Sequence, residues 1–267
     1  MDFGLETLDL IMDALILAGG EVSPDLASTV LTGGKERALI EINGRPMVAY
    51  VLDALRVTAG VERIAVVGPE DVLRIVKALE PDVVTMPQGE GMMDNVLIGM
   101  TALNWPPLAL ISTCDIPLVS AATFEQMMAR REERQLEAVY PIVRRETCEA
   151  AFPGGKRTYG TVREGAFTAG NAVVVPGPVV KNLIGFFNAM YQVRKNPIGM
   201  ARLLGAGFLL KTLTKRLTIA EAERKMSGIV GCRAGAIEMH DATIAFDVDK
   251  LEDYKVAQQA LEKRVRS

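Results

Sequence analysis

The sequence predicts an α/β fold, a three-layer α/β/α sandwich built around a mostly parallel mixed sheet. Short apolar segments alternate with amphipathic segments from Asp13 to Val143, and this alternation is typical of parallel strands joined by crossover helices. The apolar segments carry hydrophobic residues at consecutive positions, as in strands that helices cover on both faces. With 267 residues, of which 49% are hydrophobic, the chain can bury the core that such a fold needs.

Each element follows from its local pattern. An apolar run that begins at Asp13 and ends in Gly19 and Gly20 predicts a central strand. Pro46 is placed to open the first long helix and Gly60 to end it. Further strands are expected over residues 61–67, 83–86, 108–113, 138–143, 171–175 and 242–246. Further helices are expected over residues 70–79, 92–103, 123–135, 179–193, 218–226 and 250–265.

We expect one domain over residues 1–267, because no Pro/Ser-rich linker or internal repeat divides the sequence. Residues 144–240 form a less regular half, rich in insertions. Residues 1–12 precede the first strand as an N-terminal extension. Two interpretations of the extension stay open: a short amphipathic helix, or an upstream start codon with Met12 as the natural first residue.

Composition excludes several classes of protein. Thirty basic against 33 acidic residues give a net charge of -3, which argues against nucleic-acid binding through a broad basic surface. The single histidine, His240, rules out a multi-histidine metal site. Cys114, Cys148 and Cys232 form neither a zinc quartet nor a disulfide framework, so we expect a reducing, cytoplasmic location.

The N-terminus lacks the basic region of an export signal, and no uninterrupted apolar run is long enough for stable membrane insertion. The most hydrophobic stretch, Ile198 to Leu213, contains Arg202, Lys211 and several glycines. We expect a buried helix and strand there. An interfacial membrane contact, a site for a hydrophobic substrate and a homodimer interface are alternatives that the pattern leaves open.

The turn after the first strand is a candidate phosphate site. Glycines let the backbone approach a ligand closely, and successive N–H groups in such a turn can cradle phosphate oxygens. The dinucleotide fingerprint is missing, and the Walker pattern fails because Glu36 follows Lys35 where Ser or Thr is needed. A nucleoside triphosphate also needs a cation to balance its charge, and Lys35 and Arg37 lie in the segment that follows.

Acidic residues follow two predicted strands. Asp115 comes at the carboxyl end of a central strand, where parallel sheets bind ligands, and its carboxylate suits Mg²⁺ bound together with substrate phosphates. Asp247 and Asp249 come just before the closing helix, on the same face of an extended segment. One of the two can complete the Mg²⁺ site while the other caps the helix. We favour Asp247 as the ligand and Asp249 as the cap.

Four segments taken together resemble MobA-like NTP transferases, relatives of the molybdenum-cofactor guanylyltransferases and of sugar- and polyol-phosphate cytidylyltransferases. In order along the sequence they are residues 17–20 (LAGG), 38–47 (ALIEINGRPM), 114–118 (CDIPL) and 247–253 (DVDKLED). The resemblance implies a GT-A-type, Rossmann-like sheet. It also implies a Mg²⁺-dependent nucleotidyltransferase that moves a nucleoside monophosphate from an NTP to a phosphorylated small molecule and releases pyrophosphate.

The resemblance also implies roles for single residues. Asp115 and Asp247 would hold one Mg²⁺, and the catalytic cation would be Lys35 or Arg37, because Arg37 stands where the family usually has Lys. Arg also binds phosphate, through a planar fork of donors. The nucleotide would be bound by Leu17, Ala18, Gly19, Gly20, Gln88, Gly89, Gly91 and Asn95. The acceptor would be bound by Arg157, Asn171 and Lys195, which supply donors for phosphate and hydroxyl groups.

Two other functions stay open. A GT-A glycosyltransferase that uses a sugar nucleotide usually holds its metal with a D-x-D motif near the middle of its sequence. Here the acid in the middle is Asp115 alone, and Asp247 and Asp249 come near the C-terminus, an order that favours nucleotidyl transfer. A regulatory module that binds a nucleotide without turnover is the non-enzymatic alternative, motivated by Arg37 and by a first loop that is longer than the family's.

Overall fold

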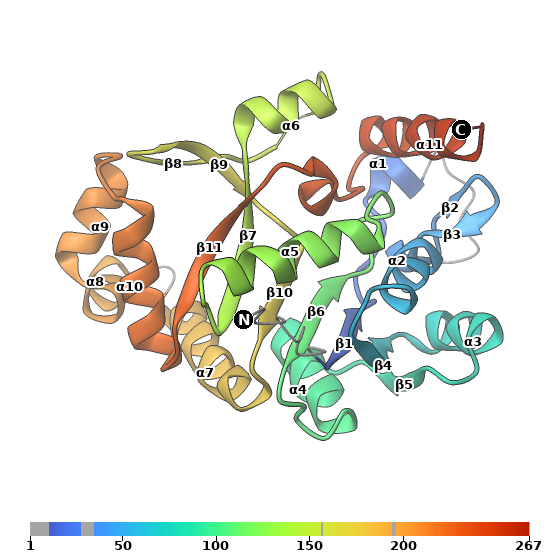
Figure 1. The fold of residues 1–267 in the computed structure, drawn as a ribbon, viewed down its shortest axis with the longest axis horizontal. Coiled ribbons are helices and arrows are strands. Elements are labelled where there is room, and N and C mark those ends of the chain that lie inside the picture. The colour runs from blue at the N-terminus through green and yellow to red at the C-terminus, as the bar shows by residue number, and fades with distance from the viewer. Residues whose placement is uncertain (1–10, 28–34, 156, 194–195, 267) are drawn as a thin grey trace, which may run out of the picture.

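The protein folds around a nine-stranded mixed sheet with helices on both faces (Figure 1), as the sequence predicts. The computed structural model describes residues 11–27, 35–155, 157–193 and 196–266. In this part of the protein the strand order is β5-β4-β1-β6-β10-β7-β9-β8, and β11 pairs with β7. These strands are β1 (Met12–Leu17), β4 (Val61–Gly68), β5 (Val84–Pro87), β6 (Ala109–Thr113), β7 (Ala138–Arg144), β8 (Gly160–Val162), β9 (Gly165–Ala169), β10 (Ala172–Val175) and β11 (Ala234–Met239).

The direction of the strands decides where a ligand can bind. Strands β5, β4, β1 and β6 run parallel, and β11 runs parallel to β7. Strand β10 is antiparallel to both β6 and β7, and β9 is antiparallel to β7 and β8. The carboxyl ends of β1, β4, β5 and β6 therefore meet at one edge of the sheet, which is the usual ligand-binding edge of α/β proteins.

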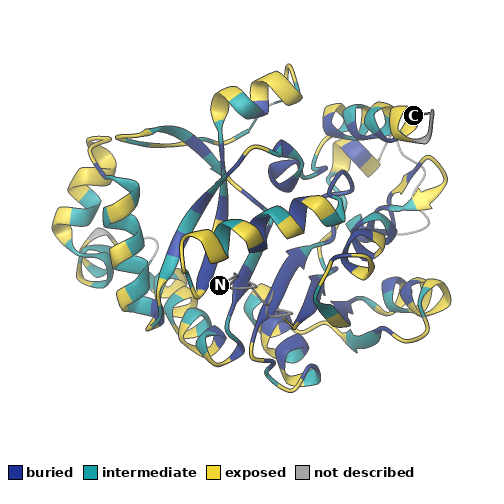
Figure 2. Cartoon of the chain, viewed as in Figure 1, coloured by how far each residue is buried: buried dark blue, intermediate teal, exposed yellow. Residues whose placement is uncertain are grey.

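Two layers of helices cover the sheet because its strands are apolar on both faces. Along β1, Ala14 and Ile16 belong to one core cluster and Leu15 to the other, as the twofold alternation of a strand requires. Figure 2 shows the resulting band of buried residues through the centre of the sheet. The first face packs against α2 (Met47–Arg56), α3 (Glu70–Leu79) and α5 (Ala121–Glu133), and the second against α4 (Met92–Ala102) and α7 (Gly177–Val193).

A third core cluster lies near the ligand-binding edge and includes Phe246, Val248, Leu26 and Ile40. It joins segments near the two ends of the sequence, since Leu26 belongs to α1 (Pro24–Ala27) and the cluster extends to α11 (Leu251–Arg266). The short hairpin of β2 (Glu41–Ile42) and β3 (Arg45–Pro46) follows η1 (Arg37–Leu39), a turn of 3-10 helix. This cluster fixes the segments that carry Arg37 and Asp249.

The expected strand over residues 242–246 is wrong. Residues Ala242–Ala245 form the 3-10 helix η2, because the side chain of Asp241 accepts a hydrogen bond from the Thr243 N–H at 3.0 Å and starts a turn. The strand of this region comes earlier, as β11, whose residues alternate between buried and half-buried positions. Outside the stretch Ile198–Leu213, the other expected elements match the structure to within a few residues.

The expected buried helix and strand over Ile198–Leu213 is also wrong. This stretch forms two short helices, α8 (Pro197–Leu204) and α9 (Ala206–Leu213), separated by Gly205 with a φ of +92°. Ile198 and Leu213 are 67% and 81% exposed. The sequence patterns did not predict α6 (Arg145–Ala151) or the β8–β9 hairpin, and they ended α10 (Ile219–Val230) too early.

Among the described residues, every helix is too short or too polar to cross a lipid bilayer.

Candidate active site

The glycine turn after β1 is open toward the ligand-binding edge. Ala18 is buried, and its N–H donates to the Val67 carbonyl at 2.8 Å, which ties the turn to β4. Gly20 has a φ of +108°, in the left-handed region that favours glycine, and a side chain there would meet no atom of the described residues within 4 Å. Within the part of the chain that the structure describes, the space above Gly20 is therefore unfilled, and Gly20 itself is exposed.

A second loop approaches this turn from β5. A Cβ atom on Gly19 would lie 2.7 Å from Oε1 of Gln88, so the absence of a side chain on Gly19 makes room for the Gln88 amide. The Gly89 N–H donates to Oδ1 of the buried Asn95 at 2.7 Å, which fixes the loop against α4. Gly91 is the N-terminal cap residue of the same helix. The loop that carries Gln88 and Gly89 therefore lies directly beside the glycine turn.

Arg37 links two carboxylates at this edge. Its Nη1 lies 2.9 Å from Oδ2 of Asp115 and 2.6 Å from Oδ1 of Asp249. Thr113 Oγ1 donates to the other Asp115 oxygen at 2.5 Å, so the carboxylate is held from both sides. Burial disfavours the charged guanidinium, but the hydrogen bond to Asp115 and the charges of Asp115 and Asp249 outweigh burial and raise the pKa of Arg37.

The glycine turn and Arg37 are also connected through the backbone. The Arg37 N–H donates to the Gly20 carbonyl at 3.0 Å, and the Val22 N–H donates to the Lys35 carbonyl at 2.9 Å. These bonds bring the segment after residue 34 back to the end of β1. Lys35 is exposed, whereas Arg37 is half-buried against Asp115. Of the two candidate cations, Arg37 is the one that the structure places beside the carboxylates.

Arg157 has a different position from the one expected of an acceptor ligand. Its guanidinium forms an ion pair with Asp247, donates to the Asp247 carbonyl at 3.2 Å and lies over the Phe246 ring at 4.6 Å from the centroid. Its side chain is only 10% exposed. These contacts engage Arg157 in positioning the segment that carries Asp247 and Asp249.

The buried pairing with Arg157 affects the pKa of Asp247. Burial raises the pKa of Asp247, the charge of Arg157 opposes the rise, and the nearby Asp249 adds to it. Burial also raises the pKa of Asp253, against the attraction of Arg157. Asp253 accepts a hydrogen bond from the Lys250 N–H at 3.1 Å, so Asp253 caps the N-terminus of α11, a role that we expected of Asp249.

The segment that carries the predicted ligand Asp247 lies close to Asp115. The Val248 N–H donates to the Asp115 carbonyl at 2.9 Å, so the segment of Asp247 and Asp249 lies directly beside the end of β6. Within the described residues there is no cluster of three or more His, Cys, Asp or Glu side chains suited to hold a metal. Two carboxylates still fit Mg²⁺, which keeps several waters and takes further oxygen ligands from phosphates.

Of the other predicted acceptor residues, the structure describes Asn171. Asn171 is half-buried; its N–H donates to the Ile244 carbonyl at 2.8 Å and its carbonyl accepts from the Thr113 N–H at 3.0 Å. Asn171 therefore links the end of β6 to η2. Lys195 lies outside the described residues. Cys114 follows β6 and is buried, and burial raises the pKa of its thiol, which keeps it protonated and unreactive.

Sequence reasoning missed two contributions to the site. Asp249 faces Arg37 and Asp115, and Ser23 Oγ donates to the Asp249 carbonyl at 2.8 Å. The spacing of Asp247 and Asp249 indicated that both carboxylates would reach the same side. It did not indicate that Arg157, 90 residues earlier, would pair with Asp247.

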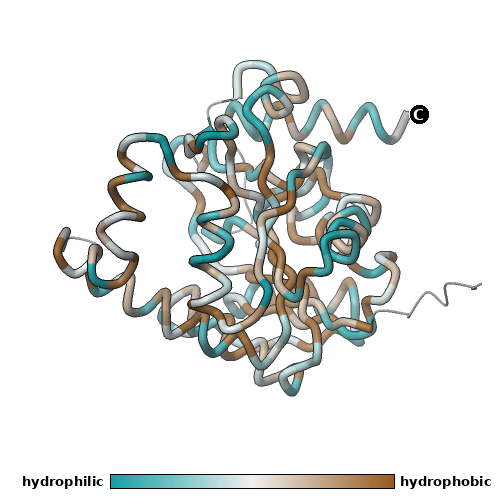
Figure 3. The backbone as a smooth tube through the Cα atoms, turned by 60° about the vertical axis from the view of Figure 1, so that its left-hand side comes forward, coloured by the Kyte–Doolittle hydropathy of each residue, from teal (hydrophilic) through white to brown (hydrophobic). Residues whose placement is uncertain are grey.

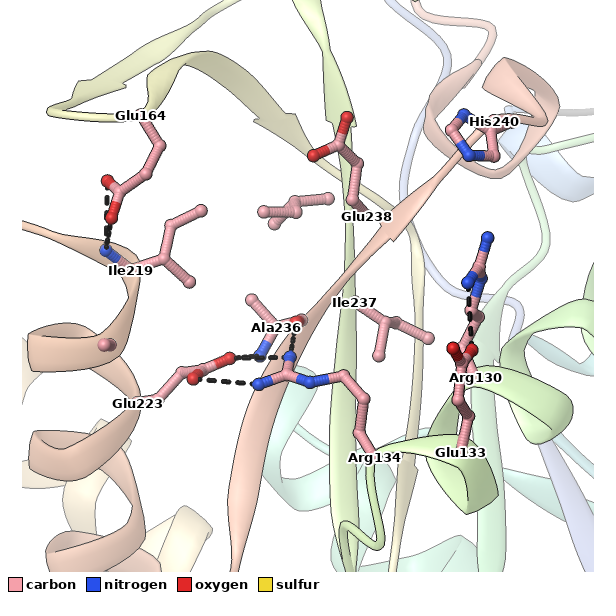
Figure 4. Close-up of a pocket in the computed structure, with 12 residues that line it drawn as sticks. Arg130, Glu133, Arg134, Glu164, Ile219, Glu223, Ala236, Ile237, Glu238 and His240 are labelled. Carbon is pink, nitrogen blue, oxygen red and sulfur yellow. Dashed lines mark hydrogen bonds and ion pairs between the residues drawn. The ribbon is translucent and has the colours of Figure 1, made fainter.

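An open cavity of about 600 Å³ lies elsewhere, between α5, α10, β7 and β11 (Figure 4). Four glutamates line it, and an assembly of carboxylates repels a triphosphate. Several of its charges are already paired: Arg134 with Glu223, and Arg130 with Glu133. The cavity therefore does not compete with the edge near Asp115 as a nucleotide site.

The family follows from a comparison with known sequences. The MobA-like NTP transferase domain matches residues 14–181, more than half of the chain. The chain belongs to this family. The matched region contains the glycine turn, Arg37 and Asp115, while Asp247 and Asp249 lie beyond it. No match was found among the curated proteins.

Solved structures support the same assignment. A hypothetical transferase from Thermus thermophilus is 31% identical to this chain, with a TM-score of 0.76, and the match covers 91% of this chain and 99% of that one. A CMP:2-keto-3-deoxy-manno-octonic acid synthetase complexed with CTP is 14% identical (TM-score 0.60; 95% and 99% covered). A 4-diphosphocytidyl-2C-methyl-D-erythritol synthase from Anaerococcus prevotii DSM 20548 is 14% identical (TM-score 0.58; 94% and 98% covered).

These comparisons agree with the architecture derived above. The two more distant structures share the fold, and the family match identifies the chain as a nucleotidyltransferase relative. The family and the fold together indicate a transferase.

Proposed function

We propose that the protein is a Mg²⁺-dependent nucleotidyltransferase that transfers a nucleoside monophosphate from an NTP to a phosphorylated small molecule. The observation that carries the proposal is the position of Arg37. This residue joins Asp115 and Asp249 through one nitrogen and is bonded through its backbone to the open glycine turn. A cation, two carboxylates and accessible backbone N–H groups in one place are the groups that phosphoryl-type transfer requires.

Each group has a defined task in this proposal. Backbone N–H groups near Gly19 and Gly20 bind phosphate oxygens. Gln88, which lies against Gly19, contacts the base, and Asn95 holds the Gln88 loop in place. Arg37 turns from the carboxylates to the phosphates and balances the negative charge of the leaving pyrophosphate. An acceptor oxygen attacks the α-phosphorus, a new P–O bond forms, and the bond from the α-phosphorus to the bridging oxygen breaks as pyrophosphate leaves.

Mg²⁺, when bound, supplies positive charge to the phosphates and orients them. We propose Asp115 and one carboxylate of the Asp247–Asp249 segment as its ligands. The geometry favours Asp249 over Asp247, the ligand that the sequence pattern favoured, because Asp249 shares Arg37 with Asp115 while Asp247 pairs with Arg157. Asp247 is then a positioning residue whose pairing with Arg157 holds the segment.

Pyrophosphate release tests the proposal. The protein is incubated with each of the four NTPs, Mg²⁺ and a panel of sugar and polyol phosphates. We expect one NTP and acceptor pair to release pyrophosphate. Asp115→Asn and Arg37→Met are expected to lower kcat by about a hundred- to a thousandfold, the usual cost of removing one electrostatic group from such a site.

The matched control is Asp71→Asn, which removes an exposed carboxylate from α3 and is expected to leave turnover unchanged. Unaltered turnover in Asp115→Asn would refute the role of Asp115. Folded protein that binds an NTP but releases no pyrophosphate with any acceptor would favour the regulatory module. Transfer from a sugar nucleotide, without pyrophosphate release from an NTP, would favour a glycosyltransferase.

A further inference from the structure

The helices farthest from the proposed site have an unusual composition. Residues 165–220 contain seven Lys or Arg and no Asp or Glu, although the whole protein has a net charge of -3. This segment includes α7, α8 and α9, which lie at the end of the molecule opposite α11 (Figure 1). Figure 3 brings this side forward and shows apolar residues recurring along its helices.

Several large apolar side chains of α8 and α9 are exposed to solvent. Helix α9 has no fully buried residue, although six of its eight residues are apolar or glycine. Leu210 and Leu213 are 62% and 81% exposed and lie three residues apart, on one face of α9. Ile198 is 67% exposed at the start of α8, and Phe187 is 39% exposed on α7, which packs against α8. Helix α8 contacts both α7 and α9, so these exposed apolar residues lie on neighbouring helices, and exposed apolar patches mark interaction surfaces.

Basic side chains accompany these apolar residues. Arg202 lies one turn after Ile198 on α8. Lys215 and Arg216 come two and three residues after Leu213, and all three basic residues are exposed. Lys211 is paired with Glu221 and does not add a free charge. Among the residues that the structure describes, none forms an ion pair or hydrogen bond with the side chains of Arg202, Lys215 and Arg216.

We propose that α8, α9 and the end of α7 form a peripheral binding surface for anionic phospholipid membranes. Exposed leucine, isoleucine and phenylalanine supply apolar area that enters the headgroup boundary, and flanking Arg and Lys attract anionic lipids. We call this set the α8–α9 surface: Phe187, Ile198, Leu210 and Leu213 with Arg202, Lys215 and Arg216. The contact lies in the plane of the interface and needs no spanning helix.

Charge decides between this occupant and a second copy of the protein. In a twofold dimer the same surface faces itself, so Arg202, Lys215 and Arg216 of both copies would approach one another without any acidic residue in the segment to pair with them. An anionic lipid surface pairs with the same charges and also accepts the leucines. The proposal concerns a surface remote from Asp115 and does not depend on the proposed activity.

Flotation with vesicles tests the proposal. The full-length protein is mixed with phosphatidylcholine vesicles that contain about 30% phosphatidylglycerol and, separately, with pure phosphatidylcholine vesicles, at about 0.1 M salt. We expect flotation with the anionic vesicles, at least about tenfold weaker partitioning to the neutral ones, and weakening at high salt because the charges are then screened.

Two variants with matched controls locate the contact. Leu210→Gln/Leu213→Gln and Arg202→Glu/Lys215→Glu are each expected to weaken anionic-vesicle partitioning by about tenfold or more. Leu79→Gln/Leu97→Gln, both 43% exposed on other helices, and Lys255→Glu/Lys263→Glu on α11 make the same chemical changes elsewhere and should leave partitioning unchanged. Circular dichroism confirms that each variant folds.

Three results would overturn the proposal. The first is no flotation of wild-type protein with anionic vesicles at low salt. The second is equal loss in the control variants, which would show that the contact is unspecific. The third is a dimer, seen by analytical ultracentrifugation, that Leu210→Gln/Leu213→Gln dissociates while vesicle binding is absent, which would assign the surface to a second copy.

Discussion

Arg37 couples the two halves of the proposed site. In the structure its guanidinium is the counter-charge of Asp115 and Asp249. A triphosphate that attracts the guanidinium leaves these carboxylates without its positive charge, and this is the charge environment in which a divalent cation binds. Binding of the nucleotide and of the metal should therefore reinforce one another.

Asp247 should make the stability of the protein depend on pH. Its pKa is raised because burial outweighs the attraction of Arg157 and Asp249 adds a like charge. The folded state therefore holds this proton to a higher pH than the unfolded state, in which the pKa of Asp is about 3.9. The stability that the protonated carboxyl contributes is present at low pH and lost as the pH rises through the raised pKa.

Comparison with Asp247→Asn, which cannot titrate, isolates this effect. We expect the free energy of unfolding of the wild type, relative to the variant, to fall as the pH rises from about 4. Urea unfolding of both proteins at a series of pH values measures it. If the free energy of unfolding of the wild type instead rises with pH relative to the variant, the ion pair with Arg157 lowers the pKa of Asp247 by more than burial raises it.

At the scale of elements, the packing of α4 on β1 places the second loop of the site. Gly99 of α4 leaves no room for a side chain, since a Cβ atom there would lie 2.3 Å from Cδ1 of Leu15. We expect Gly99→Ala to lower the free energy of unfolding by about 1–3 kcal/mol, the usual cost of overpacking a core.

The matched control for Gly99→Ala is Gly185→Ala on α7, where a Cβ atom would meet nothing within 4 Å. Alanine is the better helix former, so this change should raise stability by about 0.5–1 kcal/mol. Denaturant unfolding of both variants measures whether each substitution lowers or raises the free energy of unfolding. Equal effects at the two positions would contradict the close contact between α4 and β1.

Elements with a strong local pattern could be predicted from the sequence, and elements set by distant contacts could not. Strand β6 and helix α3 are marked by their own residues, an apolar run and an amphipathic stripe with acidic residues in the first turn. The apolar run over residues 242–246 has the same local pattern as a strand, but Asp241 turns the backbone there. β11 was missed because its small residues weaken the alternation.

At the scale of the whole molecule, the site is assembled from segments far apart in sequence. Asp115 could be predicted because it follows a strand in the centre of the sheet, and its neighbourhood with the Asp247–Asp249 segment was expected and is confirmed by the Val248–Asp115 backbone bond. The pairing of Asp247 with Arg157 could not be predicted from the sequence. It depends on Arg157 reaching across the Phe246 ring, a contact that no local pattern encodes.

In the proposed site, one nucleoside triphosphate binds where the glycine turn, Arg37 and the carboxylates meet. Calorimetric titration of each NTP, with and without Mg²⁺, into wild-type protein and Asp115→Asn measures this binding. We predict saturable binding of one NTP that Mg²⁺ strengthens in the wild type, and loss of that strengthening in the variant. Binding that is indifferent to both Mg²⁺ and Asp115, or no binding of any NTP to folded protein, would contradict the account.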